Sequence, residues 1–324
     1  MRTTVGLLLF CAAIAAEDPK PGVVPDYTAK AGSHAIQSVD AFVLHDAKRA
    51  KDLQCRATFP VGKKKAAVLV FSHGLYGSKD GYQPLARFYA SHGYVVLQAN
   101  HPDSLQLGMK ERKKAIAVAW RARPADVSFL LDSFGAIGKA VPALEGRLDP
   151  QRVAVAGHSF GAHTSQLISG VTLEAPFGGR PYSFRDKRPK AVVCISPQGP
   201  GGAMTAESWK TMQGPVMFLT GSKDESPMEK GKGGSWRRRA YTLAPSSDKY
   251  LVWIDGAEHG FGGITGVRWR GAGTANEDHV NIVKKTTLAF LDAYVRGNEK
   301  AKAYLASNGP AKAGAKTKVE YAKK

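Results

Sequence analysis

The pentapeptide Gly157-His158-Ser159-Phe160-Gly161 has the G-x-S-x-G pattern that holds a nucleophilic serine on a sharp turn between a strand and a helix. The apolar segment 152–156 runs directly into it, and the segment 162–169, closed by Gly170, has a helical pattern. We therefore expect the Ser159 hydroxyl above a sheet at the start of a helix, with glycines giving strand and helix room to approach. An ordinary glycine-rich turn is the alternative.

A serine hydroxyl is a weak nucleophile at neutral pH, so the chain must also supply a base to remove its proton and an acid to orient that base. Functional groups of parallel α/β sheets lie at the carboxyl ends of strands. Of the nine histidines, His259 is the one that follows the last predicted strand. We predict that His259 is the base, whereas His158, next to the nucleophile, should point away from it.

The acid is predicted to be Asp224, which lies just past the apolar run 216–220. The resulting chain order of serine, aspartate and histidine is the order found in one large class of serine hydrolases. Glu225 and Asp255 remain alternatives. Glu225 requires a shifted loop, and Asp255 shares the strand end with His259, where a loop-stabilising role is expected.

Attack by serine on a carbonyl also requires two donors for the oxyanion that forms. The backbone N–H of Phe160, just after the nucleophile, is one candidate. The second is expected from the glycine-containing loop 72–77, where we favour the N–H of Leu75 over that of Tyr76. A loop of this composition can also hold phosphate, but neither a P-loop nor a dinucleotide-binding fingerprint is present.

Short apolar runs alternate with longer amphipathic ones, which predicts an α/β domain with a mostly parallel sheet over residues 22–305. Helices are expected at 84–92, 124–134 and 280–295, and long loops at 171–190 and 226–247, where Trp236 and Phe177 are expected to wall the pocket. Eight strands are predicted, at 39–44, 53–59, 66–72, 94–99, 152–156, 191–196, 215–220 and 250–254.

The composition excludes a disordered chain, a collagen-like chain and a disulfide scaffold, because 43% of the 324 residues are hydrophobic and only 3 are cysteine. The 46 Lys and Arg exceed the 27 Asp and Glu, giving a net charge of +19. These basic residues are scattered and lack the pattern of a nucleic-acid-binding groove, so we expect no nucleic-acid partner and only weak attraction to anionic surfaces.

The two ends of the chain have compositions unlike the rest. Residues 1–16 combine a basic start, a short apolar run and small residues before Glu17, which predicts a signal peptide and a secreted or periplasmic protein. Cys11 matches a lipid-attachment site only loosely. The Lys-, Ala- and Gly-rich segment 306–324 is expected to be a basic, disordered tail.

Four segments carry a family resemblance: FSHGLYGSKDGYQPLARFYASHGYVVLQANHPDS, VAVAGHSFGAHTSQL, TGSKD and DGAEHGFGG. They resemble secreted bacterial α/β-hydrolases of the dienelactone-hydrolase-like type, and are similar to platelet-activating-factor acetylhydrolases and cutinase-type polyester hydrolases. The resemblance covers about residues 39–295. It implies an eight-stranded α/β-hydrolase fold and carboxylic-ester hydrolysis, with the site residues Ser159, Asp224, His259, Leu75 and Phe160.

Two positions differ from the members of these families. Dienelactone hydrolases use a cysteine nucleophile where this chain has Ser159. Platelet-activating-factor acetylhydrolases carry the acid after the sixth strand, where this chain reads Ser196-Pro197-Gln198.

The sequence thus predicts a serine esterase that acts on small-molecule or lipid-like carboxylic esters, with no cofactor and no metal. Polyester or phospholipid acyl esters are alternative substrates, and a non-catalytic binding protein on the same fold is an alternative of another class. No H-E-x-x-H or paired Cys/His spacing is present. The sequence makes no prediction of oligomeric state.

Overall fold

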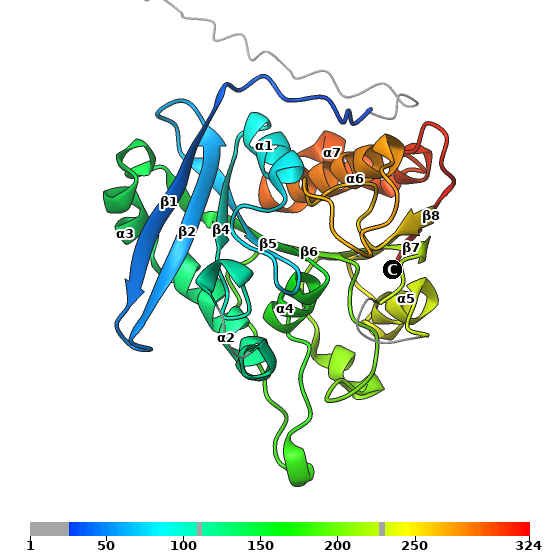
Figure 1. Ribbon diagram of the computed structural model, residues 1–324. Coiled ribbons are helices and arrows are strands. Elements are labelled where there is room, and N and C mark those ends of the chain that lie inside the picture. Colours follow the sequence, from blue (N-terminus) through cyan, green and yellow to red (C-terminus); the bar gives the residue numbers. More distant parts are fainter. Residues whose placement is uncertain (1–25, 109–111, 227–230) are drawn as a thin grey trace, which may run out of the picture.

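The computed structural model describes residues 26–108, 112–226 and 231–324, and it is built on one sheet with the strand order β1-β2-β4-β3-β5-β6-β7-β8-β9 (Figure 1). The strands from β3 to β8 are parallel, whereas β1, β2 and β9 pair antiparallel with their neighbours. The strands span Ile36–Asp46 (β1), Lys51–Pro60 (β2), Ala66–Ser72 (β3), Tyr94–Ala99 (β4), Leu148–His158 (β5), Ala191–Ile195 (β6), Val216–Lys223 (β7), Lys249–Glu258 (β8) and Val319–Lys323 (β9).

Helices cover both faces of the sheet, which explains why every residue of the central strands β3 and β4 is buried. On one face, α1 (Gln83–Ser91), α6 (Glu277–Val295) and α7 (Glu299–Ala306) bury apolar side chains against the strands. The other face is covered by α2 (Arg112–Asp132), α3 (Phe134–Ala140), α4 (Phe160–Ile168) and α5 (Gly234–Leu243). This mostly parallel sheet between helical layers confirms the predicted α/β-hydrolase fold.

The sheet has nine strands rather than the eight predicted, because the segment expected to be a disordered tail contributes β9. Strand β9 pairs antiparallel with β8 and buries Val319, while the Tyr321 hydroxyl donates to the Leu305 carbonyl at 2.7 Å. The prediction of disorder is therefore wrong for 319–323. Pairing with β9 satisfies backbone N–H and C=O groups of β8 that would be unpaired if β8 were an edge strand. This stabilisation depends on a distant strand, so it could not be predicted from the lysine-rich composition of the segment.

Two helices differ from the predictions made on the sequence. Pro124 was expected to begin a helix, but it lies inside α2, whose residues Ala119, Arg123 and Val127 form one buried stripe. Helix α5 occupies part of the segment 226–247 that was expected to be a loop. In both places burial against the sheet outweighs local residue preferences.

The predicted signal peptide and Cys11 lie outside the described residues. Among the helices that the structure does describe, none is long and apolar enough to cross a membrane. Cys55 and Cys194 are both buried free thiols.

Candidate active site

Ser159 lies on the turn between β5 and α4 with φ 58° and ψ −116°, a conformation that costs about 1–3 kcal/mol for a residue with a side chain. The flanking glycines make the turn possible because there is no space beside them. A Cβ atom on Gly157 would lie 2.2 Å from the Gly161 carbonyl oxygen, and one on Gly161 would lie 1.9 Å from the Ser72 carbonyl oxygen. Strand and helix therefore hold the serine at the carboxyl edge of the sheet.

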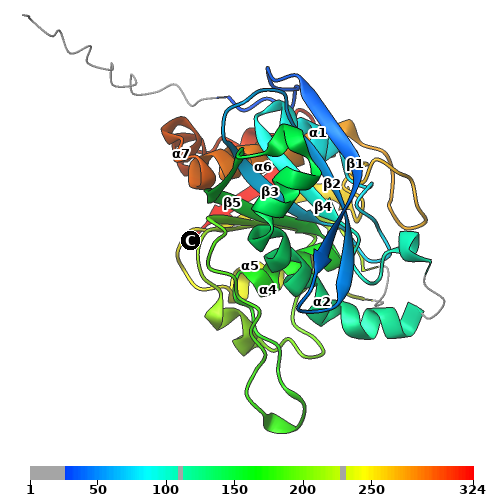
Figure 2. The same cartoon turned by 90° about the vertical axis from the view of Figure 1, so that its left-hand side faces the viewer.

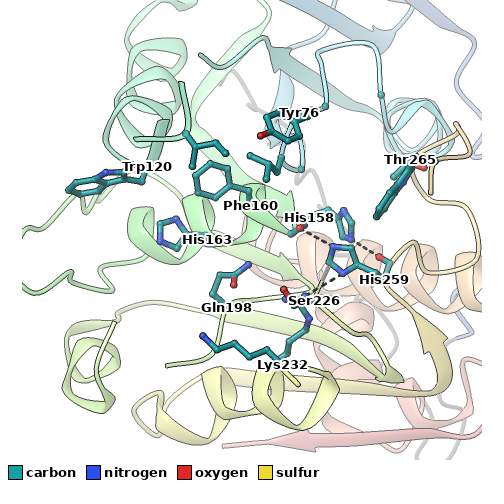
Figure 3. Close-up of a pocket in the computed structure, with 18 of the residues that line it drawn as sticks. Tyr76, Trp120, His158, Phe160, His163, Gln198, Ser226, Lys232, His259 and Thr265 are labelled. Carbon is teal, nitrogen blue, oxygen red and sulfur yellow. Dashed lines mark hydrogen bonds between the residues drawn. The ribbon is translucent and has the colours of Figure 1, made fainter. Parts of the chain in front are cut away.

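The structure brings together the three residues that were predicted from distant segments of the sequence. Figure 3 labels His259 among the residues that line the cavity. His259, directly after β8, places Nε2 3.0 Å from the Ser159 Oγ. Its Nδ1 lies 2.7 Å from Asp224 Oδ1, just past β7. Because the carboxylate can only accept, Nδ1 carries the ring proton and Nε2 is the acceptor for the serine hydroxyl.

Asp224 is fully buried and its carboxylate has several partners besides His259. Oδ1 accepts a hydrogen bond from the Ser196 hydroxyl at 2.9 Å and faces the Arg237 Nε at 3.1 Å, while Oδ2 accepts from the Thr220 hydroxyl at 2.9 Å. Burial alone would raise the pKa of Asp224, but Arg237 and His259 outweigh it and lower that pKa below its usual range. Asp224 is therefore held ionised.

Arg237 is the partner of this carboxylate that sequence reasoning missed. It is 1% exposed, and its guanidinium also donates to the carbonyls of Asp224, Ser196 and Pro197 at 3.0–3.2 Å. It thereby joins the ends of β6 and β7. The sequence does not show which of the three consecutive arginines 237–239 is buried. The next one, Arg238, forms an ion pair with Glu320 at the surface.

The two alternative acids lie elsewhere. Asp255 accepts a hydrogen bond from the Ser222 hydroxyl at 2.8 Å in an exposed position. The Glu225 carboxylate lies against Gly233, where an added Cβ would approach its Oε1 to 2.4 Å. Neither has a hydrogen bond to the ring of His259 in the described part of the chain.

Leu75 and Phe160, the two predicted oxyanion donors, both line the cavity that contains Ser159. The N–H groups of Leu75 and Phe160 have no acceptor among the described residues. In contrast, the N–H of Tyr76 donates to Asp103 Oδ2 at 3.2 Å and is therefore engaged. The geometry favours Leu75 over Tyr76.

A buried ion pair fixes the loop that carries Leu75. Arg123 and Asp103 are both fully buried and meet through two hydrogen bonds of 2.8 and 2.6 Å. Arg123 also donates to the carbonyls of His73 and Gly74 at 2.6 and 3.2 Å. This role could not be predicted from the sequence, because an arginine within a helix is usually solvated.

A second chain of hydrogen bonds connects this loop to the segment of His259. The Gly74 N–H donates to the Tyr82 hydroxyl at 3.1 Å, which lies 2.8 Å from His158 Nδ1. His158 Nε2 lies 2.8 Å from the His259 carbonyl oxygen, so Nε2 is the donor and Nδ1 accepts from Tyr82. His158 thus points away from the nucleophile, as predicted, and is a structural link.

Ser72, His101 and Asp126 form another series of serine, histidine and aspartate. His101 lies 2.9 Å from Ser72 Oγ through Nε2 and 2.9 Å from Asp126 through Nδ1. All three are at most 1% exposed, and none lines the cavity that contains Ser159. His101 is thus held in a buried hydrogen-bond network and is not a wall of the cavity that contains Ser159.

The cavity above Ser159 has a volume of about 1100 Å³ and mostly apolar walls. Trp236 lines it, as expected. Phe177 does not, because it is fully exposed in the loop 171–190, which extends away from the sheet (Figure 2). Within the described ranges no group of three or more His, Cys, Asp or Glu is arranged to hold a metal ion.

Buried histidines predict a characteristic loss of stability in acid. Burial lowers the pKa of His158 to about 3, and burial with the nearby Arg123 lowers that of His163 to about 4. The unfolded chain therefore binds more protons below about pH 6.5, the ordinary pKa of histidine, and stability falls as the pH drops toward 4.

We expect His163→Phe to make this loss shallower by up to about 1.4 kcal/mol per pH unit, the contribution of one proton. Urea unfolding of both proteins between pH 7.5 and 5 measures the slopes. Parallel slopes would show that His163 is protonated in the folded protein.

A strained serine between β5 and α4, beneath a cavity at the carboxyl edge of a parallel sheet, defines this chain as an α/β-hydrolase-fold protein with a serine-centred site. Residues 30–115 match the family model for platelet-activating factor acetylhydrolase, isoform II. The match includes the loop of Leu75. No curated protein matches the chain.

Proposed function

We propose that this protein is a serine esterase that hydrolyses carboxylic esters through an acyl-enzyme. The observation that carries the proposal is the unbroken series of hydrogen bonds from the Ser159 hydroxyl through His259 to Asp224, at 3.0 and 2.7 Å. Leu75 and Phe160 line the same cavity as the serine and have N–H groups that can stabilise an oxyanion. The family match supports ester hydrolysis as the class of reaction.

In the first half-reaction, Ser159 Oγ attacks the ester carbonyl carbon while His259 Nε2 takes the hydroxyl proton. The carbonyl oxygen becomes an oxyanion that the N–H groups of Leu75 and Phe160 stabilise. The bond to the alkoxy group then breaks, and His259 passes its proton to the departing alcohol. The acyl group remains bonded to Ser159.

In the second half-reaction, water attacks the acyl carbon and His259 takes its proton. Collapse of the tetrahedral intermediate releases the carboxylic acid and returns the proton to Ser159. Asp224 orients His259 throughout and stabilises its charged form. Arg237 keeps Asp224 ionised and fixed, so its role is one of positioning.

A fluorophosphonate probe tests the proposal because it reacts only with a serine activated by a neighbouring base. We expect the wild-type protein to be labelled and Ser159→Ala not to be. Ser222→Ala, which removes an exposed serine hydroxyl outside the site, is the matched control and should be labelled like the wild type. Absence of labelling in all three would favour the non-catalytic binding protein.

Phospholipid acyl esters are a second candidate substrate, favoured by the family whose model matches residues 30–115. The apolar walls of the cavity can accommodate an acyl chain. Platelet-activating-factor acetylhydrolases, however, carry the acid after the sixth strand. Here that position is occupied by Ser196, which donates to Asp224 instead. We therefore place simple carboxylic esters first.

We also propose that the protein is exported, on the basis of the short apolar run near the N-terminus.

A further inference from the structure

The cavity has two ends on opposite sides of the reacting groups. Figure 3 shows Trp120, Phe160 and His163 toward one end, and His259 and Thr265 toward the other. The walls of the two ends take no part in the proposed chemistry, so they can determine which esters bind.

The end that contains Trp120 has an apolar wall, which we define as the side chains of Ile116, Trp120, Leu173 and Met204. Ile116 and Trp120 lie one turn apart on α2 and therefore on the same face of that helix. Leu173 and Met204, from the segments after α4 and β6, are 4% and 5% exposed and belong to one buried cluster against which Trp120 packs. All four residues line the cavity.

The apolar wall is held by the base of the long loop 171–190. The Trp120 ring contacts those of Tyr182 and Phe184, with 5.9 and 6.1 Å between centroids. Tyr182 is in turn paired with Leu173 by two backbone hydrogen bonds of 3.0 and 2.7 Å. Because these contacts already fix the wall, an apolar ligand does not have to order it on binding.

The ring of His163 at the same end of the cavity is uncharged. It packs against the Phe160 ring with 5.5 Å between centroids. Burial and the charge of Arg123 lower the pKa of His163 to about 4, so the imidazole is neutral at pH 7. A neutral ring can be covered by an apolar chain without the cost of desolvating a charge.

The leaving group of the reaction identifies the other end. In the proposed mechanism His259 Nε2 passes its proton to the alkoxy oxygen, so that oxygen must lie within hydrogen-bond distance of the imidazole. The Trp269 ring lines the cavity and lies edge-on to the His259 ring, with 5.8 Å between centroids and an angle of 87°. The alcohol part of the ester therefore lies toward Trp269. The acyl group leaves the carbonyl carbon in a different direction and extends away from His259.

We propose that the apolar wall binds the acyl chain of the substrate and that Ile116 and Trp120 determine the acyl preference, so that esters of medium-chain carboxylic acids are the preferred substrate class. The cavity volume of about 1100 Å³ leaves room for such a chain. Each methylene that the wall buries raises kcat/KM by about fourfold. The inference rests on the proposed ester hydrolysis and deepens it.

The test uses two series of esters, each below its critical micelle concentration. Para-nitrophenyl acetate, butanoate, hexanoate and octanoate vary the acyl chain, whereas ethyl, butyl and hexyl acetate vary the alcohol. We expect kcat/KM of the wild-type protein to rise by about fourfold per methylene along the acyl series. Trp120→Ala and Ile116→Gln should each reduce this rise to about twofold or less and leave the trend along the alcohol series unchanged.

Each variant has a matched control. Val118→Gln makes a similar change on the same helix, at a residue that is 54% exposed and does not line this cavity, and it should keep both trends of the wild type. Trp269→Ala is the control for Trp120→Ala and should change the alcohol series instead. Ile116 is only half-buried, so Ile116→Gln should fold even if Trp120→Ala does not.

Two results would overturn the acyl site and leave the proposed esterase standing. One is a wild-type protein that hydrolyses the acetate as fast as the octanoate, or an Ile116→Gln variant with the acyl trend of the wild type. The other is an effect of Ile116→Gln confined to the alcohol series, which would place the alcohol against the apolar wall. No hydrolysis of either series, together with no labelling of the wild-type protein by fluorophosphonate, would contradict both proposals.

Discussion

Replacing His259 by alanine is expected to lower kcat for a soluble ester by about 10⁴-fold or more, which corresponds to about 5.5 kcal/mol of transition-state stabilisation. The reason is the position of Nε2, 3.0 Å from the Ser159 Oγ and held by Asp224 on the opposite side of the ring. Without it, the serine proton has no base. Initial rates under saturating ester measure the loss.

The matched control is His45→Ala, which removes an exposed histidine of β1 that pairs with Asp52. It should retain the wild-type kcat. The melting temperature of His259→Ala should stay close to that of the wild type, because its backbone carbonyl still accepts the hydrogen bond from His158. A kcat within tenfold of the wild type would show that another group is the base.

Replacing Arg123 by methionine is expected to lower the free energy of unfolding by about 3–5 kcal/mol, the usual effect of leaving one charge of a buried pair without its partner. Arg123 and Asp103 are both fully buried and share two short hydrogen bonds. Burial by itself raises the pKa of Asp103, and Arg123 reverses that shift and lowers it. Urea denaturation at pH 7 measures the change.

The double variant Arg123→Met with Asp103→Asn distinguishes the orphaned charge from lost packing. We expect it to regain part of the lost stability, because no buried charge remains. Its kcat should stay well below that of the wild type, since the loop of Leu75 loses the Arg123 bonds to the carbonyls of His73 and Gly74.

Arg152→Met is the surface control for the same change of side chain. Arg152 pairs with Asp149 at 2.6 Å, but its side chain is 40% exposed. Its removal should change stability by less than about 1 kcal/mol. An effect of Arg123→Met that is as small as this would show that the buried pair does not hold the loop.

Much of the site was predictable because its residues lie beside strong local signals. Ser159 follows a continuous apolar strand inside a G-x-S-x-G turn, and Asp224 and His259 each follow the end of such a strand. Parallel strands bring these ends to one edge of the sheet. The choice of Leu75 over Tyr76 needed the structure, because it depends on where Asp103 accepts its hydrogen bond.

The residues that escaped prediction act over long distances in the chain. Arg123 and Arg237 lie in helices, where arginine side chains are usually solvated, yet both are at most 1% exposed. Each is buried because a distant carboxylate, Asp103 or Asp224, lies opposite it. The position of His163 in the wall of the cavity became evident only from the structure.

The sequence by itself determined the alternation of buried strands and helices, and with it the strained turn at Ser159, because both follow from local periodicity and from glycine at 157 and 161. The tertiary structure decided which charges are buried together and that residues 319–323 complete the sheet. These outcomes arise from desolvation and long-range strand pairing. Both depend on what each group meets across the fold, which neighbouring residues in the chain do not specify.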